Sequence, residues 1–141
     1  MARILIAVDG SAPSLRALEF GASLAAKLEV GIVLLHAVPP VMLPPGDGGP
    51  EALSELRKAL QAEGHRLLEA LADKARSHGV PVETELGPGD AASTIHDRAE
   101  APDIQMVVMG SRGQGAVARL LLGSVATHVV HTSTKPVVVM R

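Results

Sequence analysis

Short apolar segments alternate with amphipathic segments along this 141-residue chain, and this alternation limits the possible folds more than any other feature. The apolar segments are rich in Val, Ile and Leu, as buried strands are, and turn residues separate them from stretches with helical spacing. Strands that alternate with helices indicate a parallel sheet with right-handed crossovers and helices on both faces. We therefore expect a single-domain α/β fold with an open, five-stranded parallel sheet. The expected strands are Arg3–Val8, Val30–Ala37, Val80–Leu86, Ile104–Met109 and Val137–Met140.

Apolar residues recur between these strands at the spacing of a helix face. The longest such pattern is Glu51–His78, and the proline- and glycine-rich segment Val38–Pro50 before it predicts a loop. The other expected helices begin after the capping residue Ser11, at Ala91 and at Ser124. One continuous apolar stripe is expected along the longest helix, formed by Leu53, Leu56, Leu60, Leu67, Leu71 and Ala75.

The composition excludes several classes of function. The chain has no cysteine, which excludes disulfides, thiolate metal sites and a cysteine nucleophile. With one Phe, no Trp or Tyr and a net charge of −2, it lacks the stacking platforms and basic surface that nucleic-acid binding needs. The longest segment without Lys, Arg, Asp or Glu is Val30–Gly46, which contains four prolines, so we expect no membrane-spanning helix. The N-terminus has no signal-peptide architecture, and we expect a cytoplasmic protein.

Charge is distributed unevenly along the chain. The segment 104–141 contains Arg112, Arg119, Lys135 and Arg141 but no acidic residue, so all 15 acidic residues precede it. A local cationic region in an acidic protein suits an anionic ligand. Buried segments of a core also lack acidic residues, however. The charge distribution alone leaves both interpretations open.

Small and acidic residues follow the expected strands at the edge where a ligand would bind. In an open parallel sheet, ligands bind beyond the carboxyl ends of the strands. Asp9 follows the first strand, and Gly110 and Gly113 follow the fourth. We expect these glycines to adopt backbone conformations closed to other residues and to let a ligand approach the backbone. Gly123 and Ser124 open a helix whose N-terminus favours a phosphate group.

The spacing Gly110-x2-Gly113-x9-Gly123-Ser124 closely resembles the nucleotide-binding motif of the universal stress protein family. The segments RILIAVDGS, VLLHAV and VVMGSRGQG resemble the first strand, the second strand and the phosphate loop of that family. The resemblance covers the whole chain and implies that residues 1–141 form one universal stress protein domain. It also implies a Rossmann-like sheet with the strand order 3-2-1-4-5. The complete glycine set favours the ATP-binding branch of the family.

The resemblance implies roles for individual residues. Asp9 would contact the nucleoside, because a carboxylate can accept hydrogen bonds from both ribose hydroxyls. The adenine would lie near Ala7 and Ala37, and the phosphates near the glycines and the last helix. Mg²⁺ would accompany a triphosphate. The implied nucleotide-binding residues are Ala7, Val8, Asp9, Ala37, Met109, Gly110, Arg112, Gly113, Gly123, Ser124 and Val125, and no residue receives a catalytic or metal-binding role.

These observations favour an ATP-binding stress-response or signalling module that acts as a nucleotide-gated homodimer with little or slow ATP hydrolysis. By resemblance, the homodimer would form through the terminal strand Val137–Met140. A true ATPase or a phosphoryl or adenylyl transferase is one alternative, although Asp9 is the only acidic residue in the expected site. A nucleotide-independent dimerisation or adaptor domain is another. The sequence does not identify the downstream protein partner.

Overall fold

The computed structural model describes residues 1–46, 48–112 and 122–141, and in this part of the chain five strands form one sheet. The sheet has the order β3-β2-β1-β4-β5, and every neighbouring pair of strands is parallel. The carboxyl ends of the strands therefore lie at one edge. The expected fold class and strand order are confirmed. The strands are β1 (Arg3–Ala7), β2 (Gly31–Ala37), β3 (Val82–Gly87), β4 (Ile104–Gly110) and β5 (Val137–Met140).

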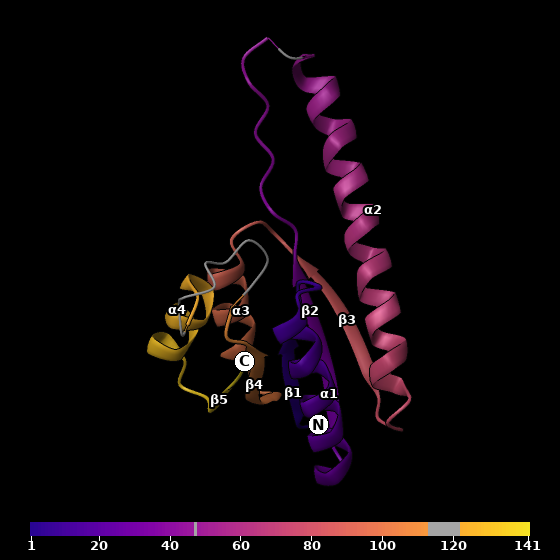
Figure 1. Ribbon diagram of the computed structural model, residues 1–141, viewed down its shortest axis with the longest axis vertical. Helices are drawn as coiled ribbons and strands as arrows, with labels where there is room; N and C mark the ends of the chain where they lie inside the picture. The colour runs from indigo at the N-terminus through magenta and orange to yellow at the C-terminus, as the bar shows by residue number, and fades with distance from the viewer. Residues whose placement is uncertain (47, 113–121) are drawn as a thin grey trace.

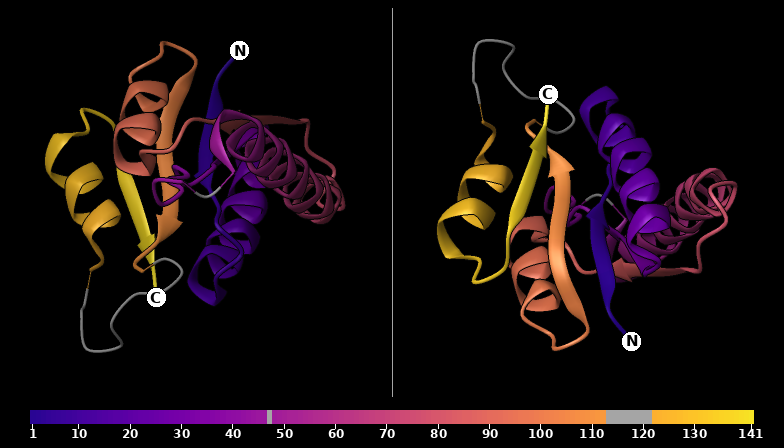
Figure 2. Two further views of the ribbon diagram at one scale, coloured as in Figure 1. Left: turned by 90° about the horizontal axis from the view of Figure 1, so that it is seen from above. Right: turned by 90° about the horizontal axis from the view of Figure 1, so that it is seen from below.

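Helices cover both faces of the sheet. The described residues form α1 (Ala12–Leu28), α2 (Gly49–Arg76), α3 (Ala91–Ala99) and α4 (Ser124–Thr132). Figure 2 shows α1 and α2 on one side of the strands and α3 and α4 on the other. None of these helices combines the length and apolar character that a membrane span requires.

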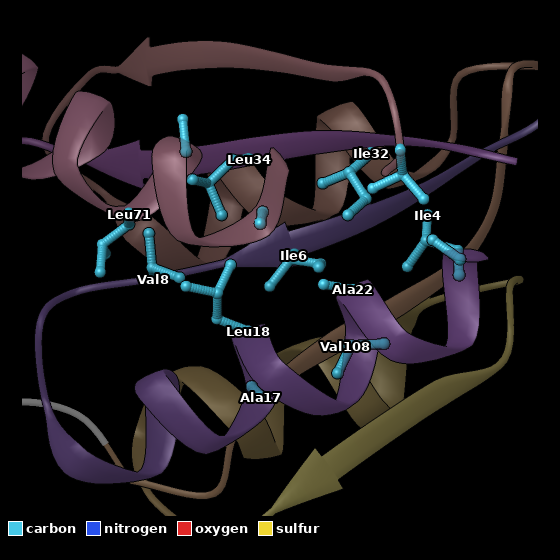
Figure 3. Close-up of a cluster of buried hydrophobic side chains, with 14 of the residues drawn as sticks. Ile4, Ile6, Val8, Ala17, Leu18, Ala22, Ile32, Leu34, Leu71 and Val108 are labelled. Carbon is cyan, nitrogen blue, oxygen red and sulfur yellow. The ribbon is translucent and has the colours of Figure 1, made fainter. Parts of the chain in front are cut away.

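The core consists of two apolar clusters, one on each face of the sheet. Ile4 and Ile6 of β1 belong to the cluster under α1 and α2 (Figure 3), whereas Leu5 and Ala7 belong to the cluster under α3 and α4. This division arises because successive side chains of a strand point to opposite faces. A strand buried on both faces needs a continuous apolar sequence, which explains why the strands were recognisable.

The apolar stripe expected along α2 is wrong for the first half of the helix. The buried positions begin only at Gly64, and Leu56 is 37% exposed. The reason is length, because a helix of 28 residues is about 42 Å long, whereas the six residues of β3 extend about 20 Å. The first half of α2 therefore extends past the end of the sheet, as Figure 1 shows.

Gly110, the last residue of β4, allows α1 to begin close against the sheet. A Cβ atom at this position would lie 2.9 Å from Cβ of Pro13 and 2.9 Å from the backbone nitrogen of Ser14. Its φ angle is not in the left-handed region. The expectation that Gly110 adopts a conformation closed to other residues is therefore wrong. Because Gly110 has no side chain, the first turn of α1 can pack directly against this residue.

A charged cluster near the amino ends of the strands joins β1, β3, α3 and the residue before β4. Arg98 donates hydrogen bonds from Nη1 and Nη2 to the two carboxylate oxygens of Asp103, each at 3.0 Å, and from Nε to Glu85 at 2.9 Å. Arg3 donates to the same Asp103 and to Glu83. The hydrogen bonds from Arg98, followed by those from Arg3, hold the pKa of Asp103 well below its usual range.

Replacing Asp103 with Asn tests this cluster. At pH 7 we expect Asp103→Asn to lower the free energy of unfolding by about 1–2 kcal/mol, since the side chain is 24% exposed and partly screened. A carboxylate with a depressed native pKa stabilises the fold above its unfolded pKa and loses this effect as the pH falls. The difference between the two proteins should therefore shrink below about pH 4.

Urea denaturation at pH 7 and at pH 3 measures that difference. Asp97→Asn is the matched control. Asp97 is an exposed carboxylate residue of α3 and lies next to Arg98 in the sequence. The importance of the cluster is disproved if both variants unfold at the same urea concentration as the unmodified protein at pH 7.

Adding one methyl group at Gly110 tests the packing of α1 on β4. Gly110→Ala should cost about 1–3 kcal/mol, because the contact at 2.9 Å is with backbone atoms of α1, which cannot move aside without shifting the helix. Gly31→Ala in β2 is the control, since the added Cβ would meet its nearest neighbour, the oxygen of Pro81, at 3.4 Å. Thermal unfolding followed by circular dichroism compares the two. Equal unfolding temperatures of Gly110→Ala and Gly31→Ala would show that α1 shifts to accept the added methyl group without loss of stability.

Candidate functional site

Asp9 is the second residue after β1 and lies half-buried in the turn that leads into α1. Its Oδ1 accepts a hydrogen bond of 2.9 Å from the backbone amide of Ser11, and its own amide donates to Oγ of Ser14 at 3.3 Å. Gly10 has a φ of 83°, a conformation that favours glycine and closes the turn. Ser11 also caps α1 by accepting from the amide of Ser14. The turn thus fixes the carboxylate at the carboxyl edge of the sheet.

His36 links the ends of β1 and β2 beside this turn. Its Nδ1 donates to the carbonyl oxygen of Val8 at 2.8 Å, since a carbonyl can only accept. The amide of Val8 donates to the oxygen of Leu35 at 2.9 Å. The side chain of Val8 is buried in the cluster under α1 and α2. These two hydrogen bonds of the Val8 backbone support the position of Asp9, and the role of Val8 as a ligand residue stays a prediction.

The other strand ends place apolar residues at the same edge. Ala7 at the end of β1 and Met109 near the end of β4 are buried in the cluster under α3 and α4. Val125 in the first turn of α4 packs against this cluster. Ala37 ends β2 and is half-buried. Ala7, Met109 and Val125 thus form an apolar wall at the carboxyl edge, on the α3 and α4 face of the sheet.

Two short backbone hydrogen bonds connect the end of β4 to α4 and β5. The amide of Gly123 donates to the oxygen of Ser111, and the amide of Ser111 donates to the oxygen of Met140, each at 2.6 Å. Gly123 is the N-cap of α4, no side chain of the described residues caps this helix by a hydrogen bond, and Ser124 is exposed. The dipole and first-turn amides of α4 can therefore stabilise an anion at this edge.

Ser111 has a buried hydroxyl group without a hydrogen-bond partner. The residue is 2% exposed, and its Oγ has no hydrogen bond in the structure as described. Such an unsatisfied group costs about 1–3 kcal/mol, so a polar ligand that reached it would recover this energy. Sequence reasoning did not single out Ser111. The only available signal was its position inside the glycine motif, immediately after Gly110.

The expected site residues therefore converge from three strand ends and one helix N-terminus. Arg112 is half-buried and follows Ser111, whose carbonyl oxygen accepts from the N-cap residue of α4. Gly113, which the resemblance assigns to the phosphates, lies outside the described residues. The arrangement offers a fixed carboxylate, an apolar wall and an uncapped helix N-terminus. These three features match the sugar, the base and the phosphates of a nucleotide.

Comparison with known proteins gives consistent results. The family model described as "Universal stress protein family" matches residues 1–141. A universal stress protein of Mycolicibacterium smegmatis is 36% identical over 97% of this chain, which spans about half (47%) of that relative. A universal stress protein of Bacillus subtilis is 31% identical over 99% of this chain and 98% of its own length.

Solved structures agree with the sequence comparisons. UspA from Lactobacillus plantarum superposes with a TM-score of 0.87 at 25% identity, over 99% of this chain and 97% of that one. A universal stress protein from Archaeoglobus fulgidus, solved in complex with dAMP, has a TM-score of 0.68 at 25% identity, over 100% and 98% of the two chains. With a family match over its full length, this chain belongs to the universal stress protein family.

Proposed function

We propose that this protein binds an adenine nucleotide, with ATP as the resident ligand, at the carboxyl edge of β1, β2 and β4. The observation that carries the proposal is the placement of the fixed Asp9 carboxylate and the uncapped N-terminus of α4 at one sheet edge, with the unpartnered hydroxyl of Ser111 beside α4. The dAMP complex of the Archaeoglobus relative supports the ligand class.

Each group of residues has a proposed role in this site. Asp9 accepts hydrogen bonds from the ribose hydroxyls, and Ala7, Ala37 and Met109 line the adenine. The phosphates are held by backbone amides and by the positive end of the α4 dipole. With ATP, Mg²⁺ would supply charge neutralisation at the phosphates. The residues proposed for the phosphates are Gly110, Arg112, Gly113, Gly123, Ser124 and Val125.

We further propose that nucleotide occupancy is communicated to β5. Ser111 bonds through its carbonyl oxygen to Gly123 of the phosphate region and through its amide to Met140 of β5. A ligand that displaces the start of α4 therefore acts on the edge strand through two hydrogen bonds. This gives the protein the character of a nucleotide-responsive stress or signalling module, with a downstream protein as its partner.

Little or slow hydrolysis of ATP fits this site. Its one proposed carboxylate, that of Asp9, is already engaged in binding the ribose and in the turn before α1.

The edge strand β5 is the proposed dimer interface. All four residues of β5 are half-buried, although among the described strands β5 has a neighbour on one side only. Arg16 donates a hydrogen bond to the carbonyl oxygen of Arg141, so this side of α1 lies against the end of β5. Phe20, one turn further on the same side, is 41% exposed. Apolar surface beside an unpaired strand edge favours pairing with a second copy.

The role of Asp9 can be tested with two ligands that differ in one hydroxyl group. Calorimetry should show tighter binding of AMP than of dAMP to the unmodified protein, because dAMP lacks the 2′-hydroxyl. In Asp9→Ala we expect AMP binding to weaken about tenfold or more and the preference for AMP over dAMP to shrink. The ratio of the two dissociation constants is independent of the folded fraction, so any loss of the turn at Ser11 does not confuse the result.

The same ligands decide the proposal as a whole. Titration of ATP with Mg²⁺, with phosphate release followed in the same sample, should show saturable binding and slow turnover. If the protein binds neither AMP nor ATP, the proposed nucleotide site is disproved. Rapid release of phosphate would favour the ATPase alternative. If Asp9→Ala keeps the full preference for AMP, Asp9 does not contact the 2′-hydroxyl of the ribose.

The dimer proposal predicts a specific effect of charge beside β5. Sedimentation of the unmodified protein at micromolar concentration should show a dimer, and Phe20→Asp should weaken dimerisation about tenfold or more because it places a charge in an apolar interface. Leu28→Asp is the matched control, since Leu28 is 48% exposed on the same helix but two turns further from the end of β5. A monomeric unmodified protein, or equal effects of both substitutions, would contradict the proposed interface.

A further inference from the structure

A cavity of about 460 Å³ lies beyond the ends of β2 and β3. One wall is formed by the protruding half of α2, and the other by residues 38–41 together with residues 86–89. In Figure 1 this region lies above the sheet, where the chain leaves β2 and runs beside α2. The volume is within the range of small-molecule sites, which is about 300–1,000 Å³.

The alternation of side chains separates this cavity from the proposed nucleotide site. A Cβ atom on Gly64 of α2 would lie 3.4 Å from Cγ2 of Val38, so Val38 points toward α2. Leu35 belongs to the cluster under α3 and α4, and Ala37 follows it by two residues on the same face. The adenine wall is thus on the α3 and α4 side, whereas the cavity faces α2.

The wall opposite α2 is held in place by direct packing. The amide of Val38 donates to the oxygen of Gly87 at 3.0 Å. Gly89 lies so close to Pro40 that an added Cβ would be 2.9 Å from Cδ of the proline. Prolines also restrict the backbone of this segment. The cavity therefore has one preformed apolar wall, to which the side chain of Leu86 contributes.

The wall formed by α2 carries the polar groups. Arg57 and Gln61 both line the cavity and are one helical turn apart, so they lie on the same side of α2. Among residues 1–46, 48–112 and 122–141, no carboxylate is within salt-bridge distance of Arg57, and neither side chain makes a hydrogen bond. An unpaired guanidinium facing an apolar wall matches a ligand with an anionic head and an apolar body.

We propose that this cavity is a second ligand site, which binds a small amphipathic anion. Arg57 and Gln61 hold the carboxylate or sulfonate head, and the apolar body packs against Pro39, Pro40 and Leu86. The assignment rests on the cavity and its two unpaired polar side chains. It does not depend on nucleotide binding at the other face of the sheet.

Two fluorescent probes of matched shape test the proposal in the full-length protein. Anilinonaphthalene sulfonate carries an anionic head, and phenylnaphthylamine has the same aromatic body without it. Arg57→Gln should weaken binding of the sulfonate about tenfold, which is what loss of a charged hydrogen bond causes, and leave binding of the neutral probe within about twofold. Lys58→Gln removes the same charge from the next residue of α2, outside the cavity wall, and should change neither affinity.

Three results would overturn the proposal. One is the absence of saturable binding of the sulfonate probe by the unmodified protein. Another is an equal loss of affinity in Arg57→Gln and Lys58→Gln, which would indicate general surface charge. The third is displacement of the probe by AMP, which would make the cavity part of the nucleotide site. Circular dichroism of both variants confirms that α2 is intact, since both residues are exposed on the helix.

Discussion

The burial of the central strands on both faces is the constraint on which the rest of this structure depends. Ile4, Leu5 and Ile6 of β1 have no exposed surface, and Val107 and Val108 of β4 have none either. An ionised group cannot be accommodated inside such a sheet without a large desolvation cost. Polar chemistry is therefore displaced to the strand ends, where loops carry it. This is why Asp9 and Ser111 lie within two residues of the ends of β1 and β4.

The same constraint divides the carboxyl edge into two regions. Side chains that leave a strand end toward α3 and α4 meet the apolar wall of Ala7 and Met109, while those that leave toward α2 meet the wall at Leu86. The side chain of His36 lies on the α2 side, where its Nδ1 bonds to the carbonyl oxygen of Val8 and its Cδ2 lies against Gly64. A ligand on either face would thus contact the same strand ends from opposite sides.

Much of this fold could be predicted because strand burial leaves a direct trace in the sequence. The helices α3 and α4 begin at the expected residues Ala91 and Ser124, Val137–Met140 has the expected bounds, and the other strands agree to within two residues. The stripe on α2 was wrong because periodicity shows which residues share a face but not whether a partner covers that face. The motif spacing around Gly110 carries no information about α1. The residue of α1 that lies against Gly110 is Pro13, which is 97 residues earlier in the chain. The orphan hydroxyl of Ser111 is likewise a property of tertiary packing.

Tertiary contacts explain one of the charges in the cationic C-terminal segment, whose role the sequence left open. Nζ of Lys135 donates to the carbonyl oxygens of Ala99, Ala101 and Ile104, at 3.1, 3.1 and 2.7 Å, so this charge caps the end of α3 and the start of β4. Arg119 lies outside the described residues. Arg112 follows Ser111, whose carbonyl oxygen accepts a hydrogen bond from Gly123 at the start of α4. In the proposed site, the backbone amides and the α4 dipole act together with Arg112, and they select phosphate by geometry more than by net charge.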